Sequence, residues 1–396
     1  MTSMHEVRRN VTVLVIAQAV LGSQMPVHII VGGLAGALLA TNPALATLPI
    51  SMTVLTSMFS APLASLFMGR FGRRAGFLLG TAFGACGAAL STIALMVSSF
   101  PLLVLGAAGT GVYLSFQGFF RFAAADTAPQ DFKPKAISWV LAGGLLNALI
   151  GPEIVRLLSG ALDPVPYAGA YAAVIGLNLL GAVVLSFLRI PTPPKFNKSG
   201  ATGRPLAEIC RQPRVIAAIA CGMVSYAVMN LVMTSTPLAM VASGFTTEHA
   251  ADVVRWHVVA MFAPSFITGN IIARIGHVAV IGIGLVLLAV CSLIALAGVD
   301  IHHFYVALIA LGFGWNFGFI GSTSLLSELH SEAERAKVQG LNDFLVFGLV
   351  ALASFASGAL LNAFGWSAVQ VAVVPTLLIA VAVLVWGRIW KVSYTG

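Results

Sequence analysis

Two carboxyl groups lie inside long apolar stretches of the chain, Glu153 in LLNALIGPEIVRLL and Asp343 in GLNDFLVFGLV. Away from water, a carboxylate either pairs with a cation or takes up a proton, because an isolated buried charge is very costly. Arg156 follows Glu153 by three residues, so these two side chains would share one face of a helix. The pattern therefore predicts ion pairing and reversible protonation as the chemistry of this chain.

The composition indicates what surrounds these acids. Of the 396 residues, 59% are hydrophobic and only 9% are charged, and the mean hydropathy is +0.97. Soluble domains carry about 25% charged residues. A water-exposed surface cannot be built from this inventory, so we expect a protein embedded in lipid.

Twelve apolar runs are long enough to cross a bilayer, which needs roughly 20 apolar residues per helix. They cover about 11–39, 44–68, 76–98, 101–125, 136–160, 167–190, 215–241, 251–273, 278–298, 304–326, 338–362 and 366–387. The links between them are short, except for a segment rich in Pro, Gly and basic residues at 191–214. We therefore predict an all-α membrane protein, with a six-helix bundle at 1–190, a cytoplasmic linker at 191–214 and a second six-helix bundle at 215–396.

The basic residues predict the orientation, since Lys and Arg in short loops stay on the cytoplasmic side. With the N-terminus inside, 18 of the 21 Lys and Arg residues fall in cytoplasmic segments or at cytoplasmic helix ends. The other three, Arg121, Arg156 and Arg255, fall inside spans. This bias accounts for the net charge of +8 without a nucleic-acid partner. It predicts a multi-pass protein of an inner membrane with both termini in the cytoplasm.

Two short links repeat each other at a constant offset of 204 residues. Residues 65–73 read SLFMGRFGR and residues 269–277 read GNIIARIGH. Leu105-Gly106 and Leu311-Gly312 form a second echo, at an offset of 206. We therefore predict two six-helix halves of common ancestry, the parallel-repeat architecture of a transporter.

The repeated link resembles the Gly-x-x-x-Asp-Arg-x-Gly-Arg-Arg signature of the major facilitator superfamily. Twelve spans, a basic central link and the two-half repeat extend that resemblance over the whole chain. In the family, the signature aspartate helps to lock the cytoplasmic side. Gly69 and Ala273 stand at the two aspartate positions here, so the resemblance implies that another acid closes the lock.

The resemblance implies that spans 5 and 8 pack across the two halves, which suggests an outer gate. It places Glu153, Arg156, Arg255 and His257 at one level in the outer half of the membrane. The hypothesis is that charge pairing closes this gate and protonation of Glu153 opens it, with His257 able to share the proton. The alternative is a local pair of Glu153 with Arg156 that never titrates.

Spans 2 and 11 are the other cross-half neighbours implied by the resemblance, which suggests an inner gate. We predict that Asp343 replaces the missing loop aspartate and pairs with Arg70 or Arg121. The alternative is that Asp343 caps its helix while Arg121 pairs with Asp126. The predicted inner gate consists of Arg70, Arg73, Arg121, Arg274 and Asp343.

Spans 1, 4, 7 and 10 line the central cavity in this family, and polar or aromatic side chains lie near their middles. The pocket predicted from these spans and from neighbouring span 5 contains Gln24, His28, Tyr113, Gln117, Asn147, Tyr226, Asn230, Trp315 and Asn316. Amides, hydroxyls and rings suit a neutral, planar ligand. The alternative for each residue alone is a hydrogen bond between helices.

These features predict a secondary active transporter of a small organic solute, working by alternating access and coupled to protons. The stretch FRFAAADTAP…KAISWVLAGG, from Phe120 to Gly144, resembles carriers assigned to riboflavin uptake in proteobacteria. A neutral heteroaromatic compound such as riboflavin is therefore the expected substrate. The alternative within transport is a multidrug/proton antiporter that works in efflux.

A membrane-embedded enzyme or assembly protein is the alternative from another class. His257, His277, His302 and His303 form no set at metal-ligand or catalytic spacing, and the four cysteines show none either. We therefore expect no catalytic residue, metal or cofactor. The expected partners of this monomer are its small-molecule substrate, protons and the lipid bilayer.

Overall fold

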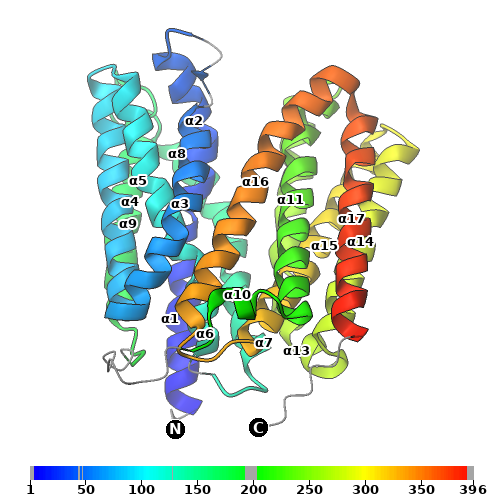
Figure 1. The fold of residues 1–396 in the computed structure, drawn as a ribbon. Coiled ribbons are helices and arrows are strands. Elements are labelled where there is room, and N and C mark those ends of the chain that lie inside the picture. Colours follow the sequence, from blue (N-terminus) through cyan, green and yellow to red (C-terminus); the bar gives the residue numbers. More distant parts are fainter. Residues whose placement is uncertain (1–3, 43–44, 47, 127, 192–202, 390–396) are drawn as a thin grey trace. The chain divides into compact units, whose positions relative to one another are not determined.

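The computed structural model describes residues 4–42, 45–46, 48–126, 128–191 and 203–389. Residues 192–202 of the predicted linker lie outside the described residues. Within the described part, all regular structure is helical (Figure 1). In the first half of the sequence the helices are α1 (Met4–Gly22), α2 (Gln24–Leu39), α3 (Leu48–Phe71), α4 (Arg73–Met96), α5 (Phe100–Gly118), α6 (Phe120–Asp126), α7 (Lys133–Ala142), the 3-10 helix η2 (Gly143–Leu146), α8 (Asn147–Leu158) and α9 (Ala168–Ser186). In the second half they are α10 (Leu206–Ile209), α11 (Pro213–Ala242), α12 (Thr247–Phe262), α13 (Ser265–Ile275), α14 (His277–Ala297), α15 (Ile301–Glu328), α16 (Arg335–Phe364) and α17 (Trp366–Ile389).

The described helices supply eleven segments long and apolar enough to cross a membrane, and a twelfth if a bent pair counts as one span. The bent pair is α12 with α13, which meet at 41°. This confirms the all-α membrane fold with the predicted spans. Four spans are broken rather than continuous: α1–α2, α5–α6, α7–η2–α8 and α12–α13.

Two of the breaks have clear local causes. Pro264 lies between α12 and α13, where its ring removes a backbone donor and disfavours a continuous helix. Ser23 lies between α1 and α2, and its Oγ donates to the Ala19 carbonyl at 2.6 Å. A serine bonded back to the preceding turn bends a helix, and Pro26 three residues later weakens the ladder further.

Packing divides the chain into two compact units, which are described separately. Unit 1 comprises 1–128, 143–200 and 335–347, and unit 2 comprises 129–142, 201–334 and 348–396. The sequence halves are therefore not identical to the packed units. Residues 335–347, the start of α16, belong to unit 1, whereas α7 belongs to unit 2.

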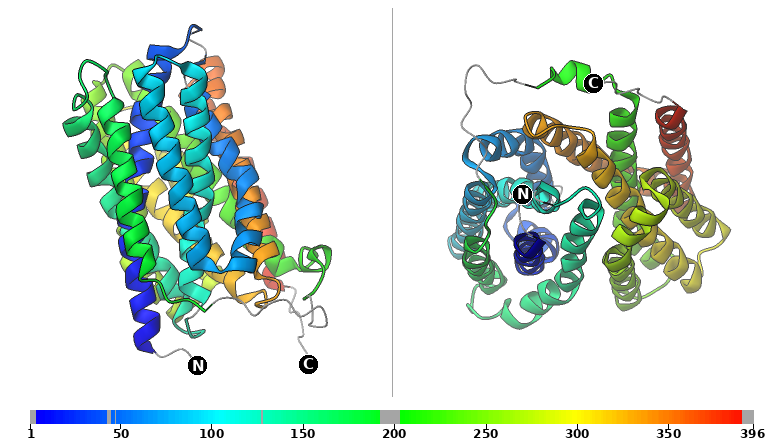
Figure 2. Two further views of the ribbon diagram at one scale, coloured as in Figure 1. Left: turned by 90° about the vertical axis from the view of Figure 1, so that its left-hand side faces the viewer. Right: turned by 90° about the horizontal axis from the view of Figure 1, so that it is seen from below.

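In unit 1, α4 packs closely against α5 and α9, and α3 packs against α5 (Figures 1 and 2). Gly87 on α4 makes this possible, because a Cβ there would lie 2.6 Å from the Gly106 carbonyl oxygen. In unit 2, α15 packs against α14, α11 and α12. Gly284 on α14 similarly faces the backbone of Gly314 and Gly318. Small residues let the backbones of membrane helices approach each other closely.

The echo of Gly106 and Gly312 is not a structural equivalence. Gly106 packs against α4, whereas a Cβ on Gly312 would meet the His257 carbonyl on α12. Gly314 and Gly318 occupy the face of α15 that corresponds to Gly106 on α5. Two residues, Leu-Gly, are too short a match to fix the rotation of a helix.

Candidate functional site

The two repeated links adopt the same backbone conformation. Gly72 has φ 89° and ψ 161°, and Gly276 has φ 85° and ψ 163°. Each amide donates to the carbonyl four residues earlier, Gly72 N to Met68 O at 2.9 Å and Gly276 N to Ile272 O at 2.8 Å. This region of backbone space is open essentially to glycine alone, so the link requires glycine at both positions.

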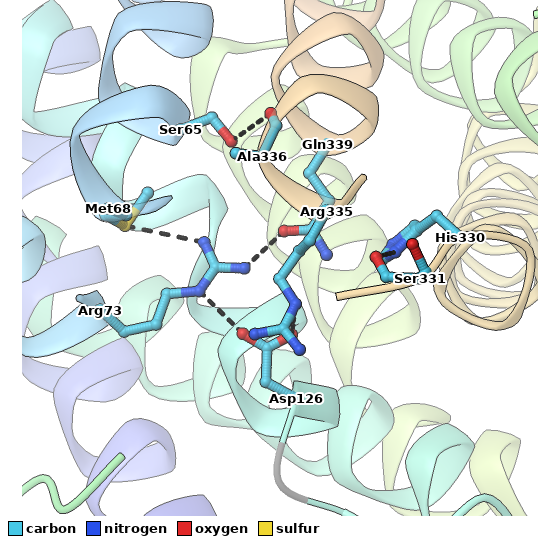
Figure 3. A network of polar contacts seen from close by, with 9 residues as sticks. All are labelled: Ser65, Met68, Arg73, Asp126, His330, Ser331, Arg335, Ala336 and Gln339. Atoms are coloured by element: carbon cyan, nitrogen blue, oxygen red, sulfur yellow. Dashed lines mark hydrogen bonds and ion pairs between the residues drawn. The ribbon is translucent and has the colours of Figure 1, made fainter. Parts of the chain in front are cut away.

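The first link leads into a buried charge cluster in unit 1 (Figure 3). Asp126, at the end of α6, receives Arg73 Nε at 2.8 Å and faces Arg335 Nε at 3.2 Å. Arg73 Nη2 also donates to Gln339 Oε1 at 2.5 Å. Asp126 and Arg73 are only 5% and 6% exposed. One carboxylate thus holds two arginines from opposite halves of the sequence.

The second link leads into a corresponding cluster in unit 2. His277 Nε2 lies 3.5 Å from Glu328 Oε1 and 3.1 Å from Ser324 Oγ. Lys133 and Arg214 act on the Glu328 carboxylate through their charges. By the repeat offsets of 204 and 202 residues, His277, Glu328 and Lys133 correspond in sequence to Arg73, Asp126 and Arg335 of unit 1.

The backbone beside these clusters repeats as well. In unit 1, Ser65 Oγ donates to the Ala336 carbonyl at 2.7 Å (Figure 3). In unit 2, Gly269 lies against the Pro134 carbonyl and the Lys135 Cα, with no room for a Cβ. Residues 65 and 269 are related by the offset of 204, and residues 134 and 336 by 202. Each unit therefore seats a segment from the other half of the sequence in the same way.

Arg73 is the one member of these two clusters that belongs to the predicted inner gate. The other charged residues of the clusters were not predicted, although the sequence contains a signal for them. Asp126-x6-Lys133 recurs as Glu328-x6-Arg335, at an offset of 202. An acid that ends one span and a base that begins the next are thus repeated in both halves. This acid–base repeat accompanies the repeat of residues 65–73 at 269–277.

Asp343 forms an ion pair with Arg121, one of the two partners predicted for it. Arg121 Nη2 donates to Asp343 Oδ1, and Asn342 Nδ2 donates to the same oxygen at 2.9 Å. The side chains of Asp343 and Arg121 are 0% and 7% exposed, so the pair is buried. The alternative partner of Arg121, Asp126, is held by Arg73 and Arg335.

Other arginines of the predicted inner gate lie at the surface of their units. Arg70 is exposed, and its guanidinium carbon lies 5.3 Å from the Phe71 ring centroid. Arg274 is also exposed. Both flank the glycine turns, one residue before a helix end.

The predicted outer-gate residues divide into local pairs. Glu153 pairs with Arg156 at 2.7 Å, and their side chains are 55% and 67% exposed. Arg255 pairs with Asp252 at 3.0 Å, also at i and i+3. His257 is buried, and its Nδ1 lies 2.8 Å from the Leu308 carbonyl, while its Nε2 has no hydrogen-bond partner. The geometry of Glu153 matches the local pair that the sequence left as the alternative.

Several predicted pocket residues of unit 1 use their polar groups within the unit. Asn178 Nδ2 donates to Gln24 Oε1 at 3.1 Å, and His28 Nε2 lies 2.9 Å from Thr110 Oγ1. With its amide suitably oriented, Asn147 donates to the backbone carbonyls of Gln18 and Ala19 at 3.1 Å.

The remaining two retain capacity for further hydrogen bonds. Gln117 makes only a long bond to Gln18 Oε1, at 3.4 Å. The Tyr113 hydroxyl lies beside Gln24 without a bond of normal geometry, although the side chain is 2% exposed. Unpaired polar groups this deeply buried are rare. Tyr113 is therefore the strongest candidate in unit 1 for contact with a ligand.

An aromatic cluster occupies the corresponding region of unit 2. Trp315 stacks on Phe319 with ring centroids 5.3 Å apart, and Tyr226 and Phe262 approach its ring edge-on, each at 5.6 Å. Trp315 is 3% exposed, and its Nε1 has no hydrogen-bond partner. Phe262 and Phe319 were not predicted. Phenylalanine is so common in this chain that sequence alone does not single out these two.

The two predicted pocket asparagines of unit 2 differ sharply. Asn316 is 0% exposed, and its Nδ2 donates to the Met261 carbonyl and Ser265 Oγ, both at 2.6 Å. Its Oδ1 accepts from Thr268 Oγ1 at 2.6 Å. Asn316 therefore fastens the break between α12 and α13. Asn230 makes only a long contact, Nδ2 to the Val350 carbonyl at 3.5 Å, and is half-buried.

A further ion pair of unit 2 lies outside the membrane spans. Arg204 donates to Glu334 through its Nε at 2.7 Å, its Nη2 at 2.9 Å and its backbone amide at 3.0 Å. The Ser331 amide donates to the same carboxylate at 2.9 Å. The side-chain hydrogen bonds from Arg204 hold the pKa of Glu334 well below its usual range. Arg204, in the C-terminal part of the predicted linker, is thus bound to Glu334, the residue that precedes α16.

Comparison with known sequences places these features in context. The sequence model of the Major Facilitator Superfamily matches residues 11–262 and 221–391. The chain is 44% identical over 386 residues to the riboflavin transporter RfnT of Brucella anthropi, covering 97% of both chains. It is 28% identical to the uncharacterized MFS-type transporter YdeG of Bacillus subtilis, covering 96% of this chain and 92% of that one.

Solved structures resemble the fold. The transporter FucP in its outward conformation matches with a TM-score of 0.78 at 16% identity, covering 97% of this chain and 99% of that chain. A bacterial homologue of the iron transporter ferroportin, in an outward-facing state, matches with a TM-score of 0.74 at 15% identity, covering 96% and 99%. At this identity the likeness concerns the fold alone.

Proposed function

Because this chain belongs to the major facilitator superfamily and is a transporter, we propose that it takes up riboflavin, or a close heteroaromatic relative, into the cell. The observation that carries this proposal is the 44% identity to the riboflavin transporter RfnT, over 97% of both chains. The expected orientation, with both termini in the cytoplasm of a bacterial cell, comes from the distribution of basic residues.

The buried aromatic rings of unit 2, with the Trp315 indole N–H and the Tyr113 hydroxyl, support a flat, neutral ligand. Trp315, Phe319 and Tyr226 offer ring faces and edges in unit 2, and Trp315 Nε1 has a hydrogen to donate. The Tyr113 hydroxyl offers the same capacity in unit 1. An isoalloxazine ring combines a stacking surface with carbonyl and ring-nitrogen acceptors, which suits the aromatic rings and the indole donor of unit 2.

Proton coupling is proposed to act through Asp343. This carboxylate is fully buried and bound to Arg121, so protonation would break the ion pair and release α16 from α6. Glu153 is more than half exposed and paired with a neighbour on its own helix, which supports a lesser role. Asp343 is therefore the stronger candidate for coupling, and Glu153 with Arg156, Arg255 and His257 stays the outer-gate proposal.

Alternating access is proposed to require release of the two exchanged segments. The start of α16 packs in unit 1 through Arg335, Ala336 and Gln339, and α7 packs in unit 2 against α13. Opening the cytoplasmic side would separate these contacts, so the Asp126 and Glu328 clusters would act as its locks. Interfaces of this kind have two discrete arrangements rather than a continuum.

Purified protein in liposomes tests the transport proposal. We expect riboflavin to accumulate in the liposomes when their lumen is made alkaline relative to the bath. In a separate binding assay, we expect the fluorescence of riboflavin to be quenched when it binds the detergent-solubilised protein. Accumulation abolished by a protonophore supports the coupling. Export of cationic dyes without riboflavin uptake would instead establish the multidrug antiporter.

A further inference from the structure

Asp343 carries one carboxylate oxygen that is left without a partner. Oδ1 receives Arg121 Nη2 and Asn342 Nδ2, whereas Oδ2 has no hydrogen-bond partner, although the residue is 0% exposed. A buried acceptor without a donor is destabilising, and more so when it is charged. Protonation of Oδ2 would remove that cost, so this oxygen is the site where a proton would bind.

Gly118 lies directly against this free oxygen. A Cβ placed on Gly118 would lie 3.1 Å from Asp343 Oδ2 and 3.7 Å from the Phe347 ring. The first distance is tighter than ordinary van der Waals contact between a carbon and an oxygen. Any residue with a Cβ at position 118 would therefore crowd Asp343 Oδ2 at its present position, whereas glycine does not.

Gly118 is also the last residue of α5, where span 4 is broken. The Phe119 amide donates to the Phe116 carbonyl at 3.1 Å, three residues back, so the regular four-residue ladder is interrupted beside Asp343. The break also lets α6 start afresh at Phe120 and present Arg121 to Asp343. Breaks of this kind are tolerated in membrane helices where they serve a buried polar site.

We propose that Gly118 is a positioning residue for proton exchange at Asp343, keeping open the space through which Oδ2 receives its proton. The inference rests on the proposed coupling role of Asp343. In the step itself, a hydrated proton transfers to Oδ2 and forms an O–H bond, and the ion pair with Arg121 is broken. Release of the same proton restores the pair. The charged groups that face Asp343 are Arg121 and, at longer range, Arg73.

Gly118→Ala tests this directly, with Gly176→Ala as the matched control. Gly176 is a helical glycine of α9 in the same unit, and a Cβ there would meet nothing within 4 Å. The readout is infrared difference spectroscopy of the carboxylic C=O stretch during a pH titration of the reconstituted protein, with Asp343→Asn to assign the band. This signal needs no transported substrate.

We expect a band that Asp343→Asn abolishes and that Gly176→Ala leaves unchanged. In Gly118→Ala the added methyl group excludes water from Oδ2 and disfavours the ionised form, so the midpoint of the band should move upward by about one pH unit. An unchanged midpoint in Gly118→Ala would overturn the inference, as would a band that survives Asp343→Asn. Normal riboflavin uptake beside an unchanged midpoint would overturn the role of Gly118 and leave the transport proposal standing.

A purely structural role for Gly118 predicts a different result. Tighter packing of α5 on α16 would lower the thermal stability of Gly118→Ala and reduce uptake and riboflavin exchange equally, without moving the midpoint. That combination would also overturn the inference. If the midpoint moves while riboflavin is not transported, the inference holds and the proposed substrate fails.

Discussion

Gly72 and Gly276 lie 204 residues apart in the chain, yet their backbone dihedral angles agree to within a few degrees. Each glycine is the N-cap of a helix, α4 or α14, whose first residue is the basic residue of a charge cluster, Arg73 or His277. The glycine turn and the basic residue that follows it therefore recur together in both halves of the sequence.

Replacement of Gly276 by alanine should therefore destabilise the protein through its backbone alone. The φ of 85° suits glycine only, and a Cβ there would meet nothing within 4 Å, so strain of roughly 1–3 kcal/mol is expected. Gly282→Ala is the matched control, because Gly282 lies within α14, has equally open surroundings and carries no positive φ. Thermal unfolding in detergent measures both; equal stability of the two variants would contradict the backbone argument.

Asp126→Asn should cause a larger loss than any exposed pair can. The substitution leaves Arg73 and Arg335 without their shared countercharge in a buried site, and breaking such a site costs about 3–5 kcal/mol. Glu153→Gln is the comparison, since exposed pairs contribute only about 0–1 kcal/mol. We expect a strong drop in the unfolding temperature for the first variant and almost none for the second. If both drop alike, the cluster is not the lock we propose.

Substitutions of Asn316 and Asn230 in unit 2 should separate stability from ligand binding. Asn316→Ala removes three hydrogen bonds at the α12–α13 break, so a loss of about 2–4 kcal/mol is expected from the unpaired groups left behind. Asn230→Ala should leave the unfolding temperature unchanged and weaken riboflavin binding, measured by fluorescence quenching. A stable Asn316→Ala protein would show that the break needs no fastening.

Glu334 gives a pH dependence whose sign follows from its pKa. The pKa in the folded protein is lowered, chiefly by the Arg204 hydrogen bonds, so the ionised form stabilises the fold. That contribution is complete above the ordinary pKa of glutamate, about 4.3, and declines as the pH falls below it. Glu334→Gln should therefore be less stable than the parent at pH 7 by about 1–3 kcal/mol, and the gap should narrow below about pH 4. A gap that is constant with pH would mean that packing, not charge, is responsible.

The fold could be predicted from sequence because lipid imposes a simple rule. Twelve apolar runs, and a glycine–arginine link repeated at one offset, are enough to indicate twelve helices in two related halves. The positions of the breaks were less accessible. Pro264 indicates one break from the sequence. The break at Phe119 lies next to Gly118, and in a chain with 40 glycines a single glycine does not mark a break.

The site was predicted unevenly for a similar reason. Asp343 stands out because a charge in an apolar run needs a partner, and Arg121 was one of two candidates named. Asp126 and Arg335 each border a short link between two spans and look like ordinary surface charges, so their burial could not be foreseen from the sequence. Asn316 was predicted as a pocket residue because an amide in the middle of a span is typical of a ligand-binding group. In the structure its amide makes three hydrogen bonds within the unit.

Asp343→Asn in proteoliposomes tests the central claim most directly, by comparing two modes of riboflavin transport in one preparation. Exchange of internal for external riboflavin at a constant pH does not require net proton movement, whereas accumulation driven by a pH gradient does. We predict that Asp343→Asn retains exchange and loses accumulation. If the variant still accumulates riboflavin in response to the pH gradient, protonation of Asp343 does not couple the transporter, and the mechanism proposed here is wrong.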